Sequence, residues 1–565
     1  MNRSTAKILA LPVAALLSIG ILASCDINLN VNLPQKSNGE SLTERLPDDA
    51  ASSNETGDIP GESGTLPADT ETGTLPADTG TGTSPADTGT GTLPEGTVTD
   101  TPVTDDTPVT DDTPVTDDTP AVPELPDGLD FEGETVEILI PSLYQDEIIG
   151  DGNGDTLSQK NFQRNAEVES QLNLVLCPLV QTATGAASDY AQTVRKMFLS
   201  GCAPDLVSLP SSCSLLATEG FFYNLGQDDA GNYTELSQPW YNSSFTAACG
   251  AGGYVPFAVG DLNISAFSRS SVVFFNRNRL AESGLTDPFQ LVLSGSWTAE
   301  KLCEMANACY ADLNGDGLPE EGDRFGFAIN SVNDVGAMLM GMGFRVTRRS
   351  EDAIPVQVLT TEEAVDRVQI AAVFQTEGFR YPNSTASGVG RTAFINDRAV
   401  FLIGRMDCGK EFANAELSFQ YGFLPLPKYN EEQSAYLTTP ITFSMTAVAK
   451  TTQPEKATAT LELLYYHSYC MIRPTYLELY SYRYSTSPVT EKVLPLILDG
   501  ITFDLATVYR EKVDNPLTQI SITLANSGSV SAYLNYSDSI RSKLESLLSD
   551  LNNRLLLAKQ TALSP

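Results

Sequence analysis

A run of oxygen-bearing side chains between positions 312 and 323 has the spacing of an EF-hand-type calcium loop. In such a loop, positions 1, 3 and 5 aim their oxygens at one centre, and Gly317 at position 6 permits the sharp turn. Position 7 offers a backbone carbonyl, and positions 9 and 12 carry acids. The predicted calcium ligands are Asp312, Asn314, Asp316, Leu318, Glu320 and Asp323.

The closing position of this loop is unusual, because Asp323 stands where a bidentate glutamate is common. Its shorter side chain predicts one-oxygen ligation, weak extracellular-type affinity for Ca²⁺ and a structural role. An acidic surface turn without metal is the alternative. Residues 151–155 begin in a similar way, but Phe162 falls at position 12, so we interpret that segment as a polar turn.

The single histidine limits the catalytic chemistry. His467 excludes H-E-x-x-H zinc sites and any multi-histidine metal centre, and a Ser-His-Asp triad would have to use it. It lies in the apolar helical run 463–467, where a packed or partly exposed helix residue is expected. Eight cysteines follow Cys25 without a C-x-x-C pair, so zinc ribbons are unsupported, while disulfides and free thiols both stay open.

The N-terminus predicts export and lipid attachment. An apolar stretch at 8–23 is short for a membrane span of about 20 residues and fits a secretory signal peptide. Leu-Ala-Ser-Cys at 22–25 resembles the lipobox of bacterial lipoproteins, in which the cysteine thiol takes the lipid. We therefore expect residues 1–24 to be a signal peptide and Cys25 to anchor the mature chain at the extracellular side of the cell membrane. A plain signal peptide with a chance cysteine is the alternative.

Residues 25–130 are expected to form a disordered tether. They contain short Thr-, Pro- and Asp-rich repeats, which bury too little apolar surface to offset the entropy of ordering. Between positions 26 and 130 there are 23 acidic and two basic residues, so this segment carries over half of the net charge of −38. The charge therefore describes a solvated tether, and it argues against nucleic acid as a partner, which requires a basic face.

From about residue 131 the pattern becomes that of an α/β protein. Apolar runs at 136–141, 172–176 and 204–209 predict strands, and helical spacing at 161–171 and 190–199 predicts the helices between them. This alternation favours a largely parallel sheet. The globular part far exceeds one ordinary domain, so two lobes are expected.

Later segments extend this prediction. Residues 271–276 are predicted to form another strand, and Thr298 is a good N-cap for the helix that follows. Trp297, at the start of that helix, is expected to be a packing residue. A capping box predicts a helix from 452 to about 469. A last amphipathic helix places six apolar side chains on one face: Ile540, Leu544, Leu547, Leu548, Leu551 and Leu555.

Several segments, taken in order, carry a family resemblance. Asn-Phe-Gln-Arg-Asn-Ala-Glu-Val-Glu at 161–169 resembles a first-helix signature, and Phe-Phe-Asn-Arg at 274–277 resembles the strand after a crossover. Together with the remaining segments they resemble the extracellular solute-binding protein family 1, which includes maltodextrin-binding proteins. Asp397 departs from that pattern, because it replaces a family glycine, and 471–530 matches poorly. The remaining segments are 216–225, 238–241, 254–261, 284–289, 295–298, 312–323 and 394–400.

The resemblance implies a two-lobed, periplasmic-binding-protein-like α/β fold of type II, with hinge crossovers and the ligand between the lobes. It implies closure around a carbohydrate and delivery of the unaltered solute to an ABC permease in the membrane. The chain is expected to be a monomer and not an enzyme. The expected division is 131–266 with 441–530 for lobe 1 and 267–440 with 531–565 for lobe 2.

A sugar presents apolar C–H faces and hydroxyls, so its site needs aromatic platforms and planar polar side chains. We expect these near strand ends and beside the crossover, where open α/β sheets bind ligands. For each candidate the alternative is a core aromatic or a surface ion pair. The candidates are Tyr144, Trp240, Tyr241, Tyr254, Asp261, Asn263, Arg405 and Asp407.

Two other function classes stay open on the sequence. A surface glycoside hydrolase needs two facing carboxylates about 5–9.5 Å apart, which 72 acidic residues do not exclude, although no local acid or nucleophile motif supports it. A non-catalytic surface adhesion protein is suggested by the tether alone. Two tryptophans are few for a long-oligosaccharide binder, so a small sugar or another solute is possible.

Overall fold

The first sheet forms because three apolar strands alternate with helices along the N-terminal part of the fold. In this computed structural model, which describes residues 122–182, 187–228, 230–376, 378–450 and 453–562, the strand order is β10-β3-β1-β2. The strands β1, β2 and β3 run parallel and β10 runs antiparallel, so the predicted β-α-β-α-β unit is confirmed. Their bounds are Glu134–Pro141 for β1, Leu174–Gln181 for β2, Leu206–Pro210 for β3 and Ser444–Val448 for β10.

Helices cover this sheet where the sequence predicts them. Helix α2 (Thr156–Leu172) begins at Asp155, whose side chain caps the amide of Ser158, and ends at Asn173 in the left-handed region. It packs on β2 and on α13 (Pro454–His467), and α13 also contacts β1. Helix α3 spans Ala187–Leu199. The N-terminal expectations, a signal peptide at 1–24, lipidation at Cys25 and most of the tether at 25–130, lie outside the described residues.

The second sheet has the order β5-β8-β4-β9, and its strands are buried along almost their whole length. Strands β5 and β8 run parallel, while β4 is antiparallel to both β8 and β9. Burial on both faces explains why these strands read as nearly continuous apolar runs. Their bounds are Ser271–Asn276 for β4, Phe325–Ile329 for β5, Ala399–Arg405 for β8 and Tyr421–Leu424 for β9.

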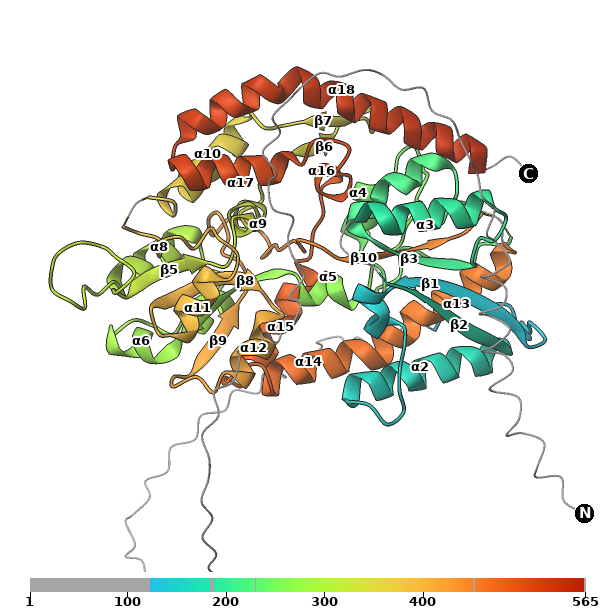
Figure 1. The fold of residues 1–565 in the computed structure, drawn as a ribbon, viewed down its shortest axis with the longest axis horizontal. Helices are drawn as coiled ribbons and strands as arrows, with labels where there is room; N and C mark the ends of the chain where they lie inside the picture. The colour runs from blue at the N-terminus through green and yellow to red at the C-terminus, as the bar shows by residue number, and fades with distance from the viewer. Residues whose placement is uncertain (1–121, 183–186, 229, 377, 451–452, 563–565) are drawn as a thin grey trace, which may run out of the picture. The chain divides into compact units, whose positions relative to one another are not determined.

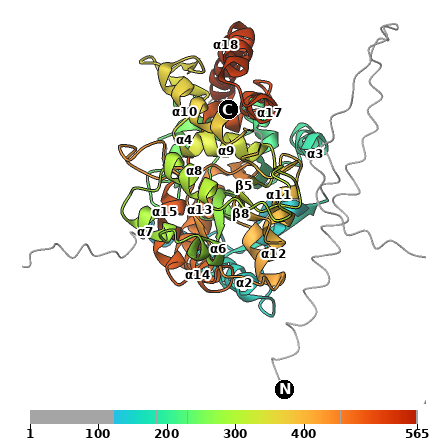
Figure 2. The same cartoon turned by 90° about the vertical axis from the view of Figure 1, so that its left-hand side faces the viewer.

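Helices lie on both sides of this second sheet. Figure 2 shows α8 (Ala299–Ala308) and α11 (Val389–Ile395) on opposite sides of β5 and β8. The predicted N-cap Thr298 accepts a hydrogen bond from the Lys301 amide at 3.3 Å, and the buried Trp297 indole donates to the Pro425 carbonyl, as expected of a packing residue. The other elements of this part are α6 (Arg277–Glu282), α7 (Pro288–Leu293), α9 (Asn333–Gly341), α10 (Glu362–Val373), α12 (Cys408–Asn414), β6 (Thr347–Arg349) and β7 (Pro355–Gln357).

Two chain segments that cross between the sheets lie side by side. The first contains α5 (Ile264–Ser268) and leads directly into β4, and the second leads from β9 to β10. Ser270 pairs with Pro440, and the Ile441 amide donates to the Arg269 carbonyl at 3.4 Å. These contacts make the paired segments the natural hinge between the sheets.

The C-terminal helices connect the two sheet-bearing parts (Figure 1). A π-helical turn at Ser468–Ile472 joins α13 to α14 (Arg473–Tyr482), so the predicted helix ends at His467 and the chain continues into a second one. Helix α14 contacts α2 and α15 (Thr490–Asp499), and α15 in turn contacts β9. The last helix is α18 (Val530–Ala562), preceded by α16 (Leu505–Val508) and α17 (Pro516–Ser527).

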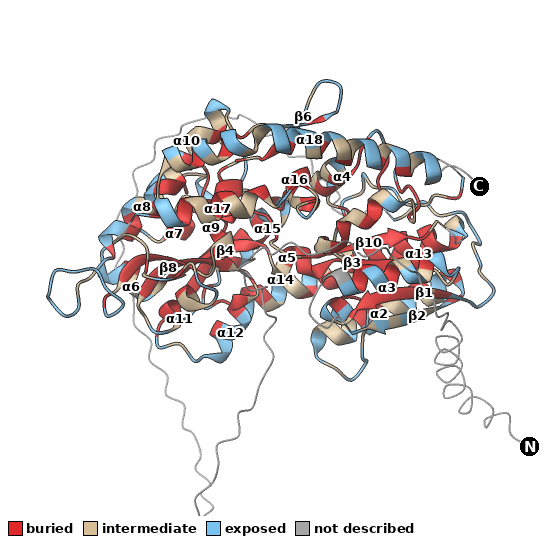
Figure 3. Cartoon of the chain, turned by 45° about the horizontal axis from the view of Figure 1, so that its top comes forward, coloured by how far each residue is buried: buried red, intermediate tan, exposed pale blue. Residues whose placement is uncertain are grey.

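Helix α18 buries the face that its periodicity predicts, as Figure 3 shows by its alternation of buried and exposed residues. It contacts α10 and β7 beside the second sheet, and also η2 (Ser211–Glu219), which follows β3 of the first sheet. This one helix therefore contacts elements beside both sheets, and the expected assignment of 531–565 to the second lobe stays a prediction. In the described part of the chain, no helix is both long and apolar enough to cross a bilayer.

Candidate functional site

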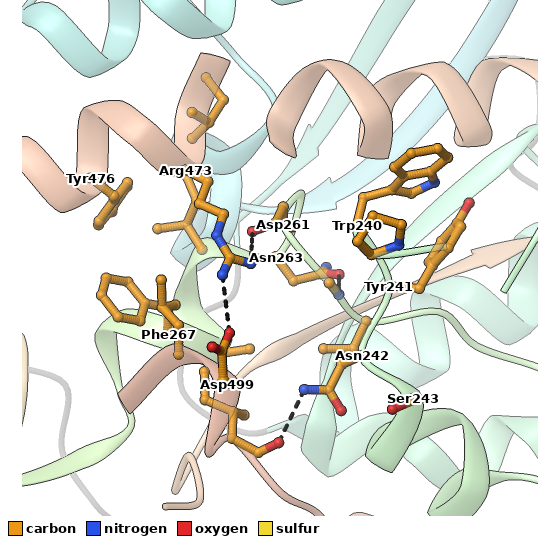
Figure 4. A pocket seen from close by; sticks show the side chains of 18 of the residues that line it. Trp240, Tyr241, Asn242, Ser243, Asp261, Asn263, Phe267, Arg473, Tyr476 and Asp499 are labelled. Atoms are coloured by element: carbon orange, nitrogen blue, oxygen red, sulfur yellow. Dashed lines mark hydrogen bonds and ion pairs between the residues drawn. The ribbon is translucent and has the colours of Figure 1, made fainter. Parts of the chain in front are cut away.

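A cavity of about 280 Å³ lies beside the first crossing segment (Figure 4). Its wall comes from four stretches of chain, at 239–244, 259–267, 472–476 and 498–501. The second stretch includes α5, which leads into β4, and the third begins α14. The fourth ends α15, which packs on β9. The cavity thus sits where elements attached to both sheets meet.

A partly buried ion pair lies in this cavity. Arg473 Nη1 lies 3.5 Å from Asp261 Oδ1, and Arg473 Nη2 lies 3.2 Å from Asp499 Oδ1. The Asp261 side chain is 12% exposed, whereas that of Asp499 is 72% exposed, so only the first carboxylate is held away from bulk water. Burial raises the pKa of Asp261 to about 7, although Arg473 opposes the shift.

Two amides in the wall are hydrogen-bonded within the protein through both their oxygen and their nitrogen atoms. Asn242 caps α4 (Ser243–Cys249) by accepting from the Phe245 amide, and its Nδ2 donates to the Ile501 carbonyl. Asn263 donates to Ser444 and Thr446, and it accepts from the Tyr465 hydroxyl and the Gly260 amide. These amides therefore fix the shape of the cavity.

Aromatic rings form one side of the cavity. Phe267 on α5 meets Tyr476 on α14 edge to face, with ring centroids 5.8 Å apart. Tyr476 also stacks on Tyr480 at 5.8 Å with an interplanar angle of 16°. Because these rings are braced by one another, they offer a rigid apolar surface beside the Asp261–Arg473 pair.

Several solved protein structures have a fold similar to that of this chain. The sugar-binding protein MalE of Xanthomonas citri aligns over 75% of this chain and 99% of its own, with 12% identity and a TM-score of 0.53. An extracellular solute-binding protein of Staphylococcus aureus, solved in complex with maltose, aligns over 73% and 98%, with 12% identity and a TM-score of 0.51. The chain has the type II solute-binding fold. No family model and no curated protein matches its sequence.

Within this solute-binding fold, four of the eight predicted ligand residues line the cavity. They are Trp240, Tyr241, Asp261 and Asn263. The first two are anchored elsewhere, because Trp240 Nε1 donates to Glu462 Oε1 at 3.1 Å and Tyr241 Oη donates to Glu462 Oε2 at 2.6 Å. Both rings are buried, so they support the wall from behind and do not form open platforms.

The other four predicted residues lie outside the cavity. Tyr254 is fully buried and donates to the Ala217 carbonyl at 3.3 Å, so we leave it out of the candidate site. Tyr144 follows β1 as expected, and the Arg269 guanidinium carbon lies 5.2 Å from its ring centroid. Arg405 is the last residue of β8 and forms a bidentate ion pair with Asp407. A ligand role for these last three residues stays a prediction.

Sequence reasoning missed several residues that shape the cavity. Phe267, Arg473, Tyr476 and Asp499 were not among the candidates, and three of them fall in the region 471–530 that matches the family poorly. One signal was available, because Tyr476, Tyr480 and Tyr484 recur at helical spacing. Such a stripe reads equally well as core, so it does not identify a site without the tertiary structure.

The predicted calcium loop lies between α8 and β5. Asp312 accepts hydrogen bonds from the Gly315 and Gly317 amides at 2.7 and 2.8 Å. Asp323 is buried and accepts from the Leu313 amide and the Tyr310 hydroxyl. Among the described residues, no group of three or more His, Cys, Asp or Glu side chains is arranged to hold a metal ion. Calcium ligation by this loop stays a prediction.

His467 and eight of the nine cysteines fall in the described part of the chain. His467 is a buried residue of α13, as expected, and burial lowers its pKa. Six cysteines in the described part of the chain are free thiols, namely Cys177, Cys249, Cys303, Cys309, Cys408 and Cys470.

Proposed function

We propose that this chain is an extracellular solute-binding lipoprotein that captures a carbohydrate and passes it unaltered to an ABC importer in the membrane. The observation that carries the proposal is the cavity between segments attached to two separate α/β sheets. The two solved proteins with similar folds are described as sugar-binding or were solved with maltose, which makes carbohydrate the first ligand class to test.

The fold suits capture and release by a hinge. The two crossing segments pair at Ser270 and Pro440, and they join two separate sheets that can act as the halves of a hinged clamp. A solute that contacts both sides stabilises the closed form in proportion to its higher affinity for that form. No bond needs to break in this cycle, so the proposal includes no catalytic step.

The binding test is isothermal titration calorimetry with a panel of mono- and disaccharides, followed by mass analysis of the recovered sugar. We expect saturable binding of at least one sugar and its recovery unchanged. Recovery of hydrolysed sugar would instead support the alternative that the protein is a glycoside hydrolase. The absence of binding across the panel would contradict the carbohydrate proposal.

The hinge is tested separately by small-angle X-ray scattering of the protein without its tether, with and without the bound sugar. We expect the radius of gyration to fall when the sugar is added, because the lobes approach one another. An unchanged radius with saturating ligand would contradict closure.

Membrane attachment at Cys25 is part of the proposal. The thiol of the mature N-terminal cysteine would carry the acyl chains, and two or more chains anchor a protein stably. Incorporation of a labelled fatty acid into the wild type and its loss in Cys25→Ala would support the anchor. Labelling of Cys25→Ala at the wild-type level would contradict it.

A further inference from the structure

The polar side chains of the cavity differ in how much hydrogen-bonding capacity they retain for a ligand. The amides of Asn242 and Asn263 are satisfied by protein partners on both their oxygen and nitrogen sides. Among the described residues, Arg473 is the only side chain that pairs with the Asp261 carboxylate. Asp261 and Arg473 therefore keep acceptor and donor capacity that faces the cavity.

The placement of this pair suits adjacent hydroxyl groups. In Figure 4 the Arg473 guanidinium reaches between Asp261 and Asp499, and all three line the same cavity. A carboxylate accepts hydrogen bonds from hydroxyls, and a guanidinium donates to hydroxyl oxygens from a fixed planar fork. A group with neighbouring hydroxyls, such as a sugar ring, satisfies both partners together.

The charge balance of the cavity selects against acidic ligands. Two carboxylates, Asp261 and Asp499, stand against one guanidinium, Arg473. A ligand carboxylate placed here would meet Asp261 in a buried setting, where like charges repel strongly. A neutral ligand faces no such penalty.

The walls and volume also restrict the ligand. Tyr476 is only partly buried and packs on the buried Phe267, so its ring offers an apolar side that suits the C–H face of a sugar ring. The volume of about 280 Å³ lies just below the range of roughly 300–1,000 Å³ that holds drug-sized ligands. This volume is enough for a small ligand such as one sugar ring.

We infer that this cavity binds one neutral sugar ring, with Asp261 and Arg473 holding neighbouring hydroxyls and Tyr476, which packs on the buried Phe267, covering its apolar face. The inference rests on the proposed function and gives it a ligand chemistry. It assigns recognition to Arg473 and Tyr476, from the part of the chain that matches the family poorly.

The test uses calorimetry at pH 8 with neutral hexoses and the uronic acids that carry the same hydroxyl pattern. The variants are Asp261→Asn and Arg473→Gln, with Arg473→Lys as a milder change that keeps the charge but loses the fork. Arg195→Gln is the matched control, because Arg195 forms an exposed ion pair with Glu219 outside the cavity. Each variant is first checked for wild-type circular dichroism and a cooperative melt.

We expect a neutral hexose to bind and each uronic acid to bind at least about tenfold more weakly than its hexose. Asp261→Asn and Arg473→Gln should weaken hexose binding at least about tenfold, and Arg195→Gln should leave it within about twofold. If one of these variants fails to fold, Arg473→Lys should still weaken binding several-fold.

Two outcomes overturn the inference in distinguishable ways. Hexose binding that survives Asp261→Asn and Arg473→Lys but is lost in Arg405→Gln places the ligand at the end of β8, and the proposed function stands while the cavity assignment fails. A folded wild type that binds no sugar of the panel overturns both. Tighter binding of a uronic acid than of its hexose also contradicts the neutral-ligand assignment.

Discussion

The Tyr241 hydroxyl donates a hydrogen bond of 2.6 Å to Glu462 across 221 positions of sequence. Glu462 lies on α13 and also accepts from Trp240, so one buried carboxylate fixes two neighbouring aromatic residues of the cavity wall. The wall that faces the cavity is therefore positioned by a helix of the first sheet. Changes to Tyr241 or Glu462 should therefore alter the stability of the fold.

Removing the hydroxyl tests the strength of this support. Tyr241→Phe leaves a buried carboxylate oxygen with one donor fewer, so we expect the free energy of unfolding to fall by about 1–3 kcal/mol. Tyr482→Phe is the matched control, because Tyr482 is exposed and donates to Glu491 at 2.9 Å. It should change stability by less than about 0.5 kcal/mol. Equal losses in urea denaturation of the two variants would contradict the structural role.

The same carboxylate predicts how stability depends on pH. Burial raises the pKa of Glu462 from 4.5 to about 7, despite opposing hydrogen bonds from Tyr241 and Trp240. The folded protein therefore holds a proton that the unfolded chain releases between these values, and stability falls as pH rises from about 4.5 to about 7. Glu462→Gln should make this fall shallower in melts at pH 5 and pH 7. Glu491→Gln on the exposed side of α15 should not.

Ligand binding should depend on pH through Asp261. Its pKa of about 7 arises from burial, which Arg473 opposes and Asp499 reinforces, and Cys470 and Tyr465 are further titratable groups that interact with it. The ionised carboxylate accepts hydrogen bonds from hydroxyls more strongly than the protonated one. Affinity for a neutral sugar should therefore rise several-fold between pH 6 and pH 8, and Asp261→Asn should remove the rise. A pH profile unchanged in that variant would assign the dependence to another group.

Trp240 behaves as a core residue in this structure. Its ring is fully buried and packs edge to face on Tyr466 at 5.3 Å. Trp240→Ala should lower the free energy of unfolding by about 3–5 kcal/mol, close to the effect of Trp297→Ala at the other buried tryptophan. Loss of sugar binding in Trp240→Ala is thus not by itself evidence of contact. Normal stability combined with lost binding would show that the ring touches the ligand.

Calcium remains to be tested at the loop 312–323. If Ca²⁺ binds there, a concentration of 100 times its Kd should stabilise the fold by about 2.7 kcal/mol, seen as a higher Tm. Asp312→Asn combined with Asp316→Asn should abolish the increase, and Mg²⁺ should not replace Ca²⁺ because it demands a tighter octahedral geometry. A calcium-dependent Tm that persists in the double variant would place the ion elsewhere.

Much of the fold was predictable from local patterns. The apolar run at β1, the capping residues Asp155 and Thr298 and the apolar face of α18 act over a few residues, so their types and spacing indicate the elements they form. The alternation of strands and helices then predicts parallel layers. The π-helical turn that separates α13 from α14 was not predictable in this way, since helical spacing continues through it.

The sequence by itself determined the α/β class, the expectation of two lobes and the catalytic chemistries that a chain with one histidine excludes. Only the tertiary structure decided which of the candidate residues share a cavity. Asp261 and Arg473 lie far apart along the chain, and their 3.5 Å contact depends on how α5 and α14 pack. How these helices pack depends on many contacts between residues that are distant in the sequence. The spacing of residues within one helix gives no information about those contacts.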